Sequence, residues 1–390
     1  MKPAYDVIVV GGGPAGSMAA RYAAGRGASV ALFEKDREVG VPVRCAEGVS
    51  HAGLAAVVEN IPSRWIAQKI TGAVLHAPSG AEVPLHTDQI GYILHRKIFD
   101  YDLAQMAAAA GVAIFTRAHV AGLIMEQGRT AGVVVDHLGE RRRIEARLVI
   151  AADGVESRAA RWAGLATRTA LADMESCAQA TIGGYQGDPE MLHFFFSRSM
   201  APGGYLWIFP KGNGMANVGL GISASAGGER SPHDYLEAFL ARFFPGASIL
   251  GRVCGGVPCS NTLKELAADG LMVVGDAAHQ ANPLTGGGIV TGMIAGRIAG
   301  ETAAEAVATG RCDRETLRRY PKAWLAGEGG KQAQFYRLRK FVFSLGDEDY
   351  DALARSVLRI PVEKRTILSI MKSALLHKPS LLLDAVKLFT

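Results

Sequence analysis

The sequence is poor in cysteine and lacks any long apolar run. Its 390 residues contain five cysteines, a small and odd number that argues against the disulfide framework of a secreted domain. No stretch of 18 consecutive apolar residues is present, so the sequence predicts no membrane-spanning helix. The first predicted strand begins at Tyr5, and no cleavable leader is recognised before it. We therefore expect a reducing, cytosolic compartment.

Signatures of several protein classes are also missing. The sequence has neither an H-E-x-x-H zinc motif nor a G-x-S-x-G nucleophile motif. Cys254 and Cys259 have no second cluster of Cys or His, so we expect no metal site and assign them to a structural turn. No basic, aromatic-rich reading motif is present, so we do not expect nucleic acid as a partner. At this length, more than one domain is expected.

The net charge of +5 is concentrated in residues 331–390, while residues 1–330 are neutral. We predict that residues 331–390 are helical. Two of their segments, residues 367–379 and 381–389, mix apolar residues with lysine, as a helix lying on an anionic membrane would. The alternative is a pair of helices packed on the rest of the protein.

The first 34 residues have the pattern of a nucleotide-binding unit. A β-branched run at residues 5–10 precedes G-x-G-x-x-G, an Ala-rich helix at 17–25 and a second strand at 28–34. Gly11 permits the tight turn, Gly13 lets a pyrophosphate approach the backbone, and Gly16 allows close helix packing. Glu34 is placed to bind an adenosine ribose, which favours FAD or NAD over NADP. The alternative is a glycine-rich turn without a ligand.

Three later segments favour a flavin. A helix is predicted from Ile98 to about residue 110, just after Arg96. A strand ends at Asp153, and another ends before Asp276, which is followed by three glycines at 286–288. Acidic residues at strand ends suit a ribityl chain with several hydroxyls, and glycine backbone can approach a ring edge.

Short strands punctuated by glycine and proline fill residues 65–94 and about 170–265, as in an antiparallel sheet. We predict strands at 177–185, 193–197, 204–209 and 216–222. Alternation places Tyr205, Trp207 and Phe209 on one face, which is either core or the wall of a cavity.

The order of these motifs resembles the para-hydroxybenzoate hydroxylase class of flavoproteins. The resemblance implies an α/β fold with a Rossmann-type FAD-binding domain made of residues 1–64, 95–169 and 266–330. An inserted α+β domain with an antiparallel β-sheet (65–94 and 170–265) would bind the substrate, and a helical region (331–390) would follow. The FAD ligands implied besides the three motif glycines are Ala15, Glu34, Arg96, Val120, Asp153, Asp276, Gly288 and Ile289.

Two stretches carry a narrower resemblance. Residues 38–50, EVGVPVRCAEGVS, and residues 202–210, PGGYLWIFP, are similar to signatures of the geranylgeranyl reductase family, in particular its archaeal lipid branch. The resemblance implies that Cys45, Ala46 and Gly48 line the flavin. Cys45 is our candidate for the proton donor, and Tyr205 is the alternative. The resemblance also implies that Tyr205, Trp207 and Phe209 contact the substrate. The alternative for Cys45 is a small, packed apolar side chain.

The family resemblance implies an FAD-dependent enzyme that saturates isolated C=C bonds of prenylated lipids, at the inner face of the cell membrane. The resemblance implies a ferredoxin-like protein, a deazaflavin or NAD(P)H as the electron donor. The sequence has a single dinucleotide fingerprint, which does not decide among these donors. Three alternatives stay open: an FAD-dependent monooxygenase, a reductase of another prenyl substrate such as a chlorophyll pigment, and a flavin redox sensor or lipid carrier without turnover.

Overall fold

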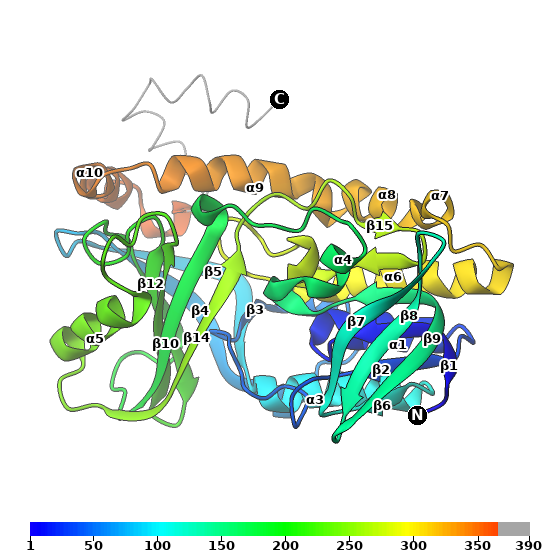
Figure 1. Ribbon diagram of the computed structural model, residues 1–390. Coiled ribbons are helices and arrows are strands. Elements are labelled where there is room, and N and C mark those ends of the chain that lie inside the picture. The colour runs from blue at the N-terminus through cyan, green and yellow to red at the C-terminus, as the bar shows by residue number, and fades with distance from the viewer. Residues whose placement is uncertain (366–390) are drawn as a thin grey trace. The chain divides into compact units, whose positions relative to one another are not determined.

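The computed structural model (Figure 1) describes residues 1–365, apart from the side chains of residues 86–90. Its contacts divide the chain into two compact units. Unit 1 comprises residues 1–43, 96–169 and 258–333. Unit 2 comprises residues 44–95, 170–257 and, among the described residues, 334–365. The predicted interfacial segments, 367–379 and 381–389, lie outside the described residues.

Unit 1 is built on a mostly parallel sheet with the strand order β15-β16-β9-β1-β2-β6. Val7, Ile8 and Val9 of the central strand are fully buried, as expected for a parallel strand covered on both faces. An antiparallel pair, β7 and β8, extends from β9. The strands are β1 (Ala4–Val10), β2 (Val30–Phe33), β6 (Ala113–Phe115), β7 (Ala118–Glu126), β8 (Arg129–His137), β9 (Glu140–Ala151), β15 (Ala267–Ala268) and β16 (Leu271–Val273).

The helices of unit 1 place the two glycine-rich segments side by side. Helix α6 packs directly on α1, because an ideal Cβ at Gly296 would lie only 2.2 Å from the carbonyl oxygen of Ala15. The same holds for Gly300 against Ala19, at 2.3 Å. The helices are α1 (Pro14–Ala24), α3 (Arg96–Ala109), α4 (Arg158–Trp162), α6 (Ile289–Thr309), α7 (Arg314–Leu317), α8 (Arg319–Ala326) and the first part of α9 (Glu328–Val342), with 3-10 turns η2 (Gly154–Glu156) and η4 (Gly275–Ala278).

Unit 2 is built on an eight-stranded sheet with the order β14-β10-β13-β12-β11-β4-β5-β3. These strands are β3 (Gly48–Ser50), β4 (Ile66–His76), β5 (Glu82–Leu94), β10 (Met174–Gly183), β11 (Met191–Phe195), β12 (Tyr205–Gly212), β13 (Met215–Ser223) and β14 (Ser248–Pro258). The helices are α2 (His51–Ala55), α5 (Pro232–Phe243), α10 (Asp347–Leu358) and the end of α9, with 3-10 turns η1 (Ser63–Trp65), η3 (Leu171–Asp173) and η5 (Val362–Lys364).

Unit 2 differs from the sequence expectations in three details. Strands β11 and β4 pair in parallel, which is possible because they come from separate inserted segments and no hairpin joins them. Residues 44–64, which we assigned to the FAD domain, group with unit 2, where β3 pairs with β5. The expected turn at 254–259 was wrong, because residues 254–258 complete β14, an edge strand that tolerates its glycines and Pro258.

The contact between α6 and α1 leads to a stability prediction. A Gly-to-Ala change inside a helix normally stabilises it by about 0.5–1 kcal/mol. At Gly296 the added methyl group would meet the backbone of α1, so we expect Gly296→Ala to destabilise the protein by about 1–3 kcal/mol instead. Thermal unfolding of the FAD-loaded protein measures this.

The matched control is Gly251→Ala on edge strand β14, where an added Cβ meets nothing within 4 Å. Its melting temperature should stay within about 2 °C of the wild-type value, since surface changes alter stability by less than about 0.5 kcal/mol. A Gly296→Ala protein as stable as this control would contradict the packing described for α6.

Candidate active site

The turn after β1 forms a cradle at the start of α1. Gly11 has a φ of 103°, and an ideal Cβ on it would lie 2.3 Å from the carbonyl oxygen of Ala152, so only glycine fits. An ideal Cβ on Gly13, the N-cap of α1, would meet nothing within 4 Å, so the backbone there is open to a ligand. The N-terminal amides of α1 give this opening a positive potential, which suits a pyrophosphate.

Glu34 follows β2 and closes one side of the cradle. Its carboxylate accepts hydrogen bonds from the backbone amides of Gly12 (2.7 Å) and Asp36 (2.8 Å). These two bonds orient the side chain, and a carboxylate can accept further donors such as ribose hydroxyls.

Two further acids of unit 1, Asp153 and Asp276, are partly buried and follow the ends of β9 and β16. Asp153 accepts a hydrogen bond from the amide of Ala159 (2.9 Å) through Oδ2, whereas its buried Oδ1 has no hydrogen-bond partner among the described residues. Burial raises the pKa of Asp153 and also that of Asp276, which the positive charge of Arg96 partly opposes. Buried carboxylate oxygens need donors, and several hydroxyl groups on one ligand would supply them.

The remaining predicted cofactor residues of unit 1 are placed on the same elements. Arg96, at the start of α3, forms a two-point ion pair with Asp100 (2.7 and 2.8 Å). Gly288 is the N-cap of α6, and an ideal Cβ on it would lie 3.0 Å from Oδ1 of Asp276. Ala15 and Gly16 lie on α1, Ile289 begins α6, and Val120 is buried on β7.

These residues fit FAD. The open Gly13 backbone and Glu34 provide for the pyrophosphate and the adenosine ribose, and the orphaned oxygen of Asp153 provides an acceptor for a hydroxyl. Asp276 and the α6 N-terminus would hold the flavin end. The individual ligand assignments stay predictions.

His279 does not have the environment of a reactive histidine. Its Nδ1 lies 2.9 Å from Oγ of Ser260, and its Nε2 lies 3.0 Å from Oγ1 of Thr169. Its carbonyl oxygen accepts a hydrogen bond from Gln332 (2.6 Å). Both ring nitrogens are therefore engaged, and His279 joins three segments of unit 1.

In unit 2 the Cys45 loop is anchored by a buried carboxylate. Glu47 is 2% exposed, has a φ of 72°, and accepts hydrogen bonds from Asn217 Nδ2 (2.7 Å) and from Lys211 Nζ. Asn217 is in turn oriented by Thr181, whose hydroxyl donates to its Oδ1 (2.8 Å). Two neighbouring strands, β12 and β13, thus hold the loop through one charged group.

The same loop is fixed at Cys45 itself. Its Sγ accepts a hydrogen bond from the amide of Glu47 (3.2 Å), an arrangement that stabilises a thiolate. Its carbonyl oxygen accepts one from Gln179 Nε2 (3.1 Å), and Gln179 Oε1 accepts one from the indole of Trp207 (3.2 Å). Gln179 therefore links the cysteine loop to the aromatic strand β12.

The aromatic residues of β12 form one apolar face, as the alternation predicted. Trp207 and Phe209 are each 8% exposed and pack with Ile70 and Ile93, with Tyr205 and Cys177 at the edge of the cluster. Ring centroids of Tyr205 and Trp207 lie 5.9 Å apart, and those of Phe194 and Phe209 lie 5.5 Å apart. This face can contact a long hydrocarbon chain. Whether it lines a substrate cavity stays a prediction.

Sequence reasoning did not identify Gln179, Lys211 or Asn217. Each lies on a strand of the predicted sheet, but polar residues on strands are usually solvent-facing, so none stood out. The signal available was Glu47 itself, which with Arg44 is one of two charged residues between positions 39 and 50, since a buried acid requires a cation.

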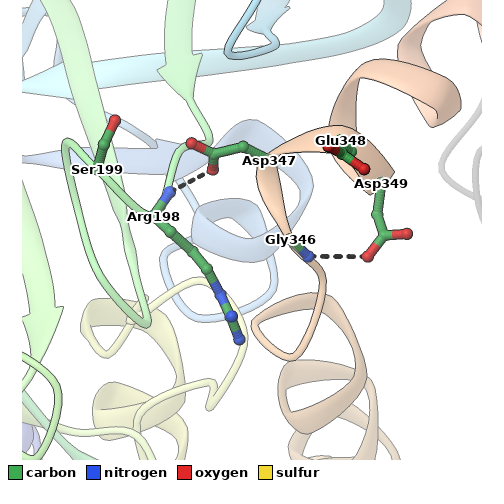
Figure 2. Close-up of a pocket in the computed structure, with 6 residues that line it drawn as sticks. All are labelled: Arg198, Ser199, Gly346, Asp347, Glu348 and Asp349. Atoms are coloured by element: carbon green, nitrogen blue, oxygen red, sulfur yellow. Dashed lines mark hydrogen bonds between the residues drawn. The ribbon is translucent and has the colours of Figure 1, made fainter.

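A hollow of about 730 Å³ lies elsewhere in unit 2, where the β11–β12 connection meets the start of α10 (Figure 2). Asp347 accepts hydrogen bonds there from the amide of Arg198 (2.7 Å) and the hydroxyl of Ser197 (3.2 Å), and Asp349 caps the amide of Gly346 (2.9 Å). These contacts attach α10 to unit 2, and no predicted site residue lines this hollow.

Two family models match the sequence. The model described as geranylgeranyl reductase catalytic domain matches residues 173–257, which hold Gln179, Trp207 and Lys211. The model described as FAD dependent oxidoreductase matches residues 6–206. Among curated proteins, digeranylgeranylglycerophospholipid reductase 1 of Methanococcoides burtonii is 42% identical, covering 100% of this chain and 96% of its own. The digeranylgeranylglycerophospholipid reductase of Methanothrix thermoacetophila is 43% identical over 97% of both chains.

Solved structures with a similar fold include another geranylgeranyl reductase-like protein. A geranylgeranyl bacteriochlorophyll reductase-like protein from Thermoplasma acidophilum superposes with a TM-score of 0.93 at 34% identity, covering 99% of both chains. A flavin-dependent brominase superposes with a TM-score of 0.75 at 19% identity over 95% of this chain and 94% of its own, which shows a shared fold alone.

Replacing Lys211 tests the anchor of the Cys45 loop. Lys211→Met leaves the buried carboxylate of Glu47 without its cation, so we expect a loss of about 3–5 kcal/mol in the free energy of unfolding. Glu47→Gln combined with Lys211→Met should recover part of it, because no buried charge remains. Arg141→Gln, which breaks an exposed ion pair with Asp136, is the control and should leave stability unchanged. Equal effects of Lys211→Met and Arg141→Gln would contradict this description.

Replacing Asp153 tests the flavin cradle. Asp153→Ala removes the orphaned acceptor, so we expect FAD affinity to fall by about 10- to 100-fold, the value of one hydrogen bond to a charged group. Fluorescence titration of the FAD-free protein with FAD measures the dissociation constant. Asp136→Ala, at an exposed acid of β8, is the matched control. Unchanged FAD affinity in Asp153→Ala would exclude Asp153 as a ligand.

Proposed function

The chain belongs to the geranylgeranyl reductase family of FAD-dependent oxidoreductases, and from this premise we propose that it saturates isolated C=C bonds of geranylgeranyl chains in an archaeal-type ether phospholipid. The observation that carries the proposal is the Cys45 loop, which is fixed by Glu47 on the strands of the matched catalytic region, together with the apolar face of β12. A long unsaturated hydrocarbon complements that face.

The reaction adds one hydride and one proton to each alkene. Bound FAD, once reduced, supplies the hydride. An isolated alkene has no carbonyl to accept charge, so the proton must come from a group held in a fixed position. We assign that role to Cys45, with Tyr205 as the second candidate.

The residues around Cys45 suit proton donation. After the thiol gives up its proton, the amide of Glu47 stabilises the sulfur anion through the hydrogen bond at 3.2 Å. Gln179 holds the Cys45 backbone, and its other end is fixed by Trp207, so the thiol is positioned by residues that themselves are packed. The aromatic face orients the hydrocarbon and excludes water. That Cys45, Ala46 and Gly48 line the flavin is part of this proposal.

We further propose that the substrate reaches the enzyme from a membrane surface. Withdrawing a twenty-carbon chain from water involves on the order of 15 kcal/mol, at about 0.8 kcal/mol per methylene, so exchange through water would be slow. Exchange between a bilayer and an apolar site avoids that cost. None of the helices within residues 1–365 is long and apolar enough to span a membrane. We propose a peripheral, cytoplasmic location, with the C-terminal segments 367–379 and 381–389 contacting anionic lipid.

The electron donor belongs to the proposal only as a class: a ferredoxin-like protein, a deazaflavin or NAD(P)H. The direct test of function needs none of them. The protein is reduced anaerobically with dithionite and mixed with digeranylgeranylglycerophospholipid, and the lipid is analysed by mass spectrometry. Flavin reoxidation with a gain of two hydrogens per double bond supports the proposal. A flavin that stays reduced until air is admitted, or hydroxylated lipid formed as oxygen is consumed, would support the sensor or monooxygenase alternatives.

Cys45→Ala gives a sharper prediction for the same assay. Removing a positioned acid costs about 10²–10⁴-fold in rate, so we expect flavin reoxidation by the lipid to slow by at least about 100-fold while FAD stays bound. Cys312→Ala, at a buried cysteine of unit 1, is the matched control and should reduce lipid at the wild-type rate. Wild-type turnover by a Cys45→Ala protein that retains FAD would remove the cysteine from the chemistry and turn attention to Tyr205.

The membrane proposal is tested by sedimentation with liposomes. The full chain should co-sediment with vesicles containing anionic phospholipid and should be released at high salt. A chain ending at residue 365 should bind less than one tenth as much. Equal binding of both chains, or no binding of the full chain, would exclude the C-terminal segment as a membrane contact.

A further inference from the structure

Glu175 is a buried acid that neither the flavin cradle nor the Cys45 anchor uses. It is 8% exposed and lies on β10. Alternate residues of a strand point to the same face, so Glu175 shares a face with Cys177 and Gln179, the residue that holds Cys45. An ionisable group on the apolar face of a site that consumes protons is a candidate for function.

The partner of Glu175 comes from the end of α9 within unit 2. Arg339 is buried, and its Nη2 lies 2.5 Å from Oε1 of Glu175, while both of its terminal nitrogens donate to the carbonyl oxygen of Ala172 (3.2 Å). The second oxygen, Oε2, is buried and has no hydrogen-bond partner among the described residues. A buried oxygen without a partner is less costly in the neutral acid than in the carboxylate, so a proton on Glu175 is placed on this oxygen.

The orphaned oxygen lies next to the signature strand and the Cys177 thiol. An ideal Cβ at Gly204, the residue before Tyr205, would lie 2.9 Å from Glu175 Oε2. An ideal Cβ at Gly221 would lie 3.4 Å from the same oxygen and 3.3 Å from Cys177 Sγ. The carboxyl oxygen and the thiol therefore flank one point on β13 that has no side chain.

Two opposing influences act on the protonation of Glu175. Burial raises its pKa, and the charge and hydrogen bond of Arg339 partly offset this. Asp173, 3.8 Å from Arg339, is the other charged group facing the pair. Burial, followed by the charges of Glu175, Cys254 and Cys45, raises the pKa of Cys177 to about 12, so Cys177 stays a thiol. The net effect is a raised pKa for Glu175, which favours the acid form that a proton source requires.

We propose that Glu175 holds the proton that restores Cys45 after each double bond is reduced. This inference rests on the proposed function. In each cycle Cys45 gives its proton to an alkene carbon, and a proton from the Glu175 carboxyl then restores Cys45 by way of the Cys177 thiol, which lies between Glu175 and Gln179 on the same face of β10. The Cys177 thiol gives up one proton as it takes another, and solvent returns a proton to Glu175. Arg339 stabilises the carboxylate formed in between. Glu175 acts through Cys45 and does not contact the alkene. Its role is to hold the replacement proton in position.

Glu175→Gln tests this, because the amide keeps the shape but carries no exchangeable acid. With excess dithionite under anaerobic conditions, the first double bond per enzyme should be reduced at the wild-type rate, since Cys45 starts protonated. Later double bonds should be reduced at least about tenfold more slowly. Glu175→Asp should restore part of the rate at which the later double bonds are reduced. Tyr336→Phe is the control, because it removes another contact of α9, with Asp173, and leaves Glu175 in place.

The pH profile separates proton supply from a structural role. A raised pKa keeps the acid form of Glu175 present to higher pH. In the wild-type enzyme the rate of the second phase, the reduction of the later double bonds, should therefore fall as pH rises through the pKa of Glu175. This fall is a descending limb in the pH profile. That limb should be absent in Glu175→Gln. A Glu175→Gln protein with both phases and the limb unchanged would overturn the inference and leave the proposed function standing. Failure of the wild-type enzyme to saturate the lipid would overturn the proposed function itself. If Glu175→Gln does not fold, a wild-type second phase without the limb would suffice to reject the inference.

Discussion

The buried carboxylate of Glu47 is the constraint on which the candidate active site depends. It brings Lys211 and Asn217, from two strands, onto one loop, and that loop carries Cys45. A buried charge is costly unless it is fully paired, so the loop has a strong preference for the one position in which Glu47 meets both partners. The amide of the same residue donates to the Cys45 sulfur, and one residue thus sets both the position of the thiol and the stability of its anion.

The apolar face of β12 and the polar residues of β10 contribute to the candidate active site through different interactions. The aromatic rings offer contact area without specific bonds, which suits a hydrocarbon that must slide to present one double bond after another. Gln179 joins this face to the loop through two hydrogen bonds. Glu175 and Arg339 keep one titratable group at the edge of an otherwise apolar surface. A reductase of isolated alkenes needs both properties, a dry site and a renewable proton.

Much of unit 1 was predictable because its signals are local. The glycine spacing at 11–16, the buried β-branched strands and the acids at strand ends each follow from a few consecutive residues, and the structure places them around one cradle. That unit 2 is a β-sheet was also predictable, as was the shared face of Tyr205, Trp207 and Phe209, because strand alternation is a local pattern. The pairing of Glu47 with Lys211 was not, since 164 residues separate them and no spacing rule connects them. The same holds for the parallel contact of β11 with β4 and for Arg339 on Glu175.

One measurement tests the central claim most directly: the rate at which anaerobically reduced Glu47→Gln enzyme saturates the lipid, compared with wild type at equal bound FAD. The account predicts that lipid saturation slows by at least about 100-fold when the amounts of bound FAD are matched, as for loss of a positioned acid. Saturation at the wild-type rate would contradict the claim that the buried Glu47 positions Cys45 for the reaction.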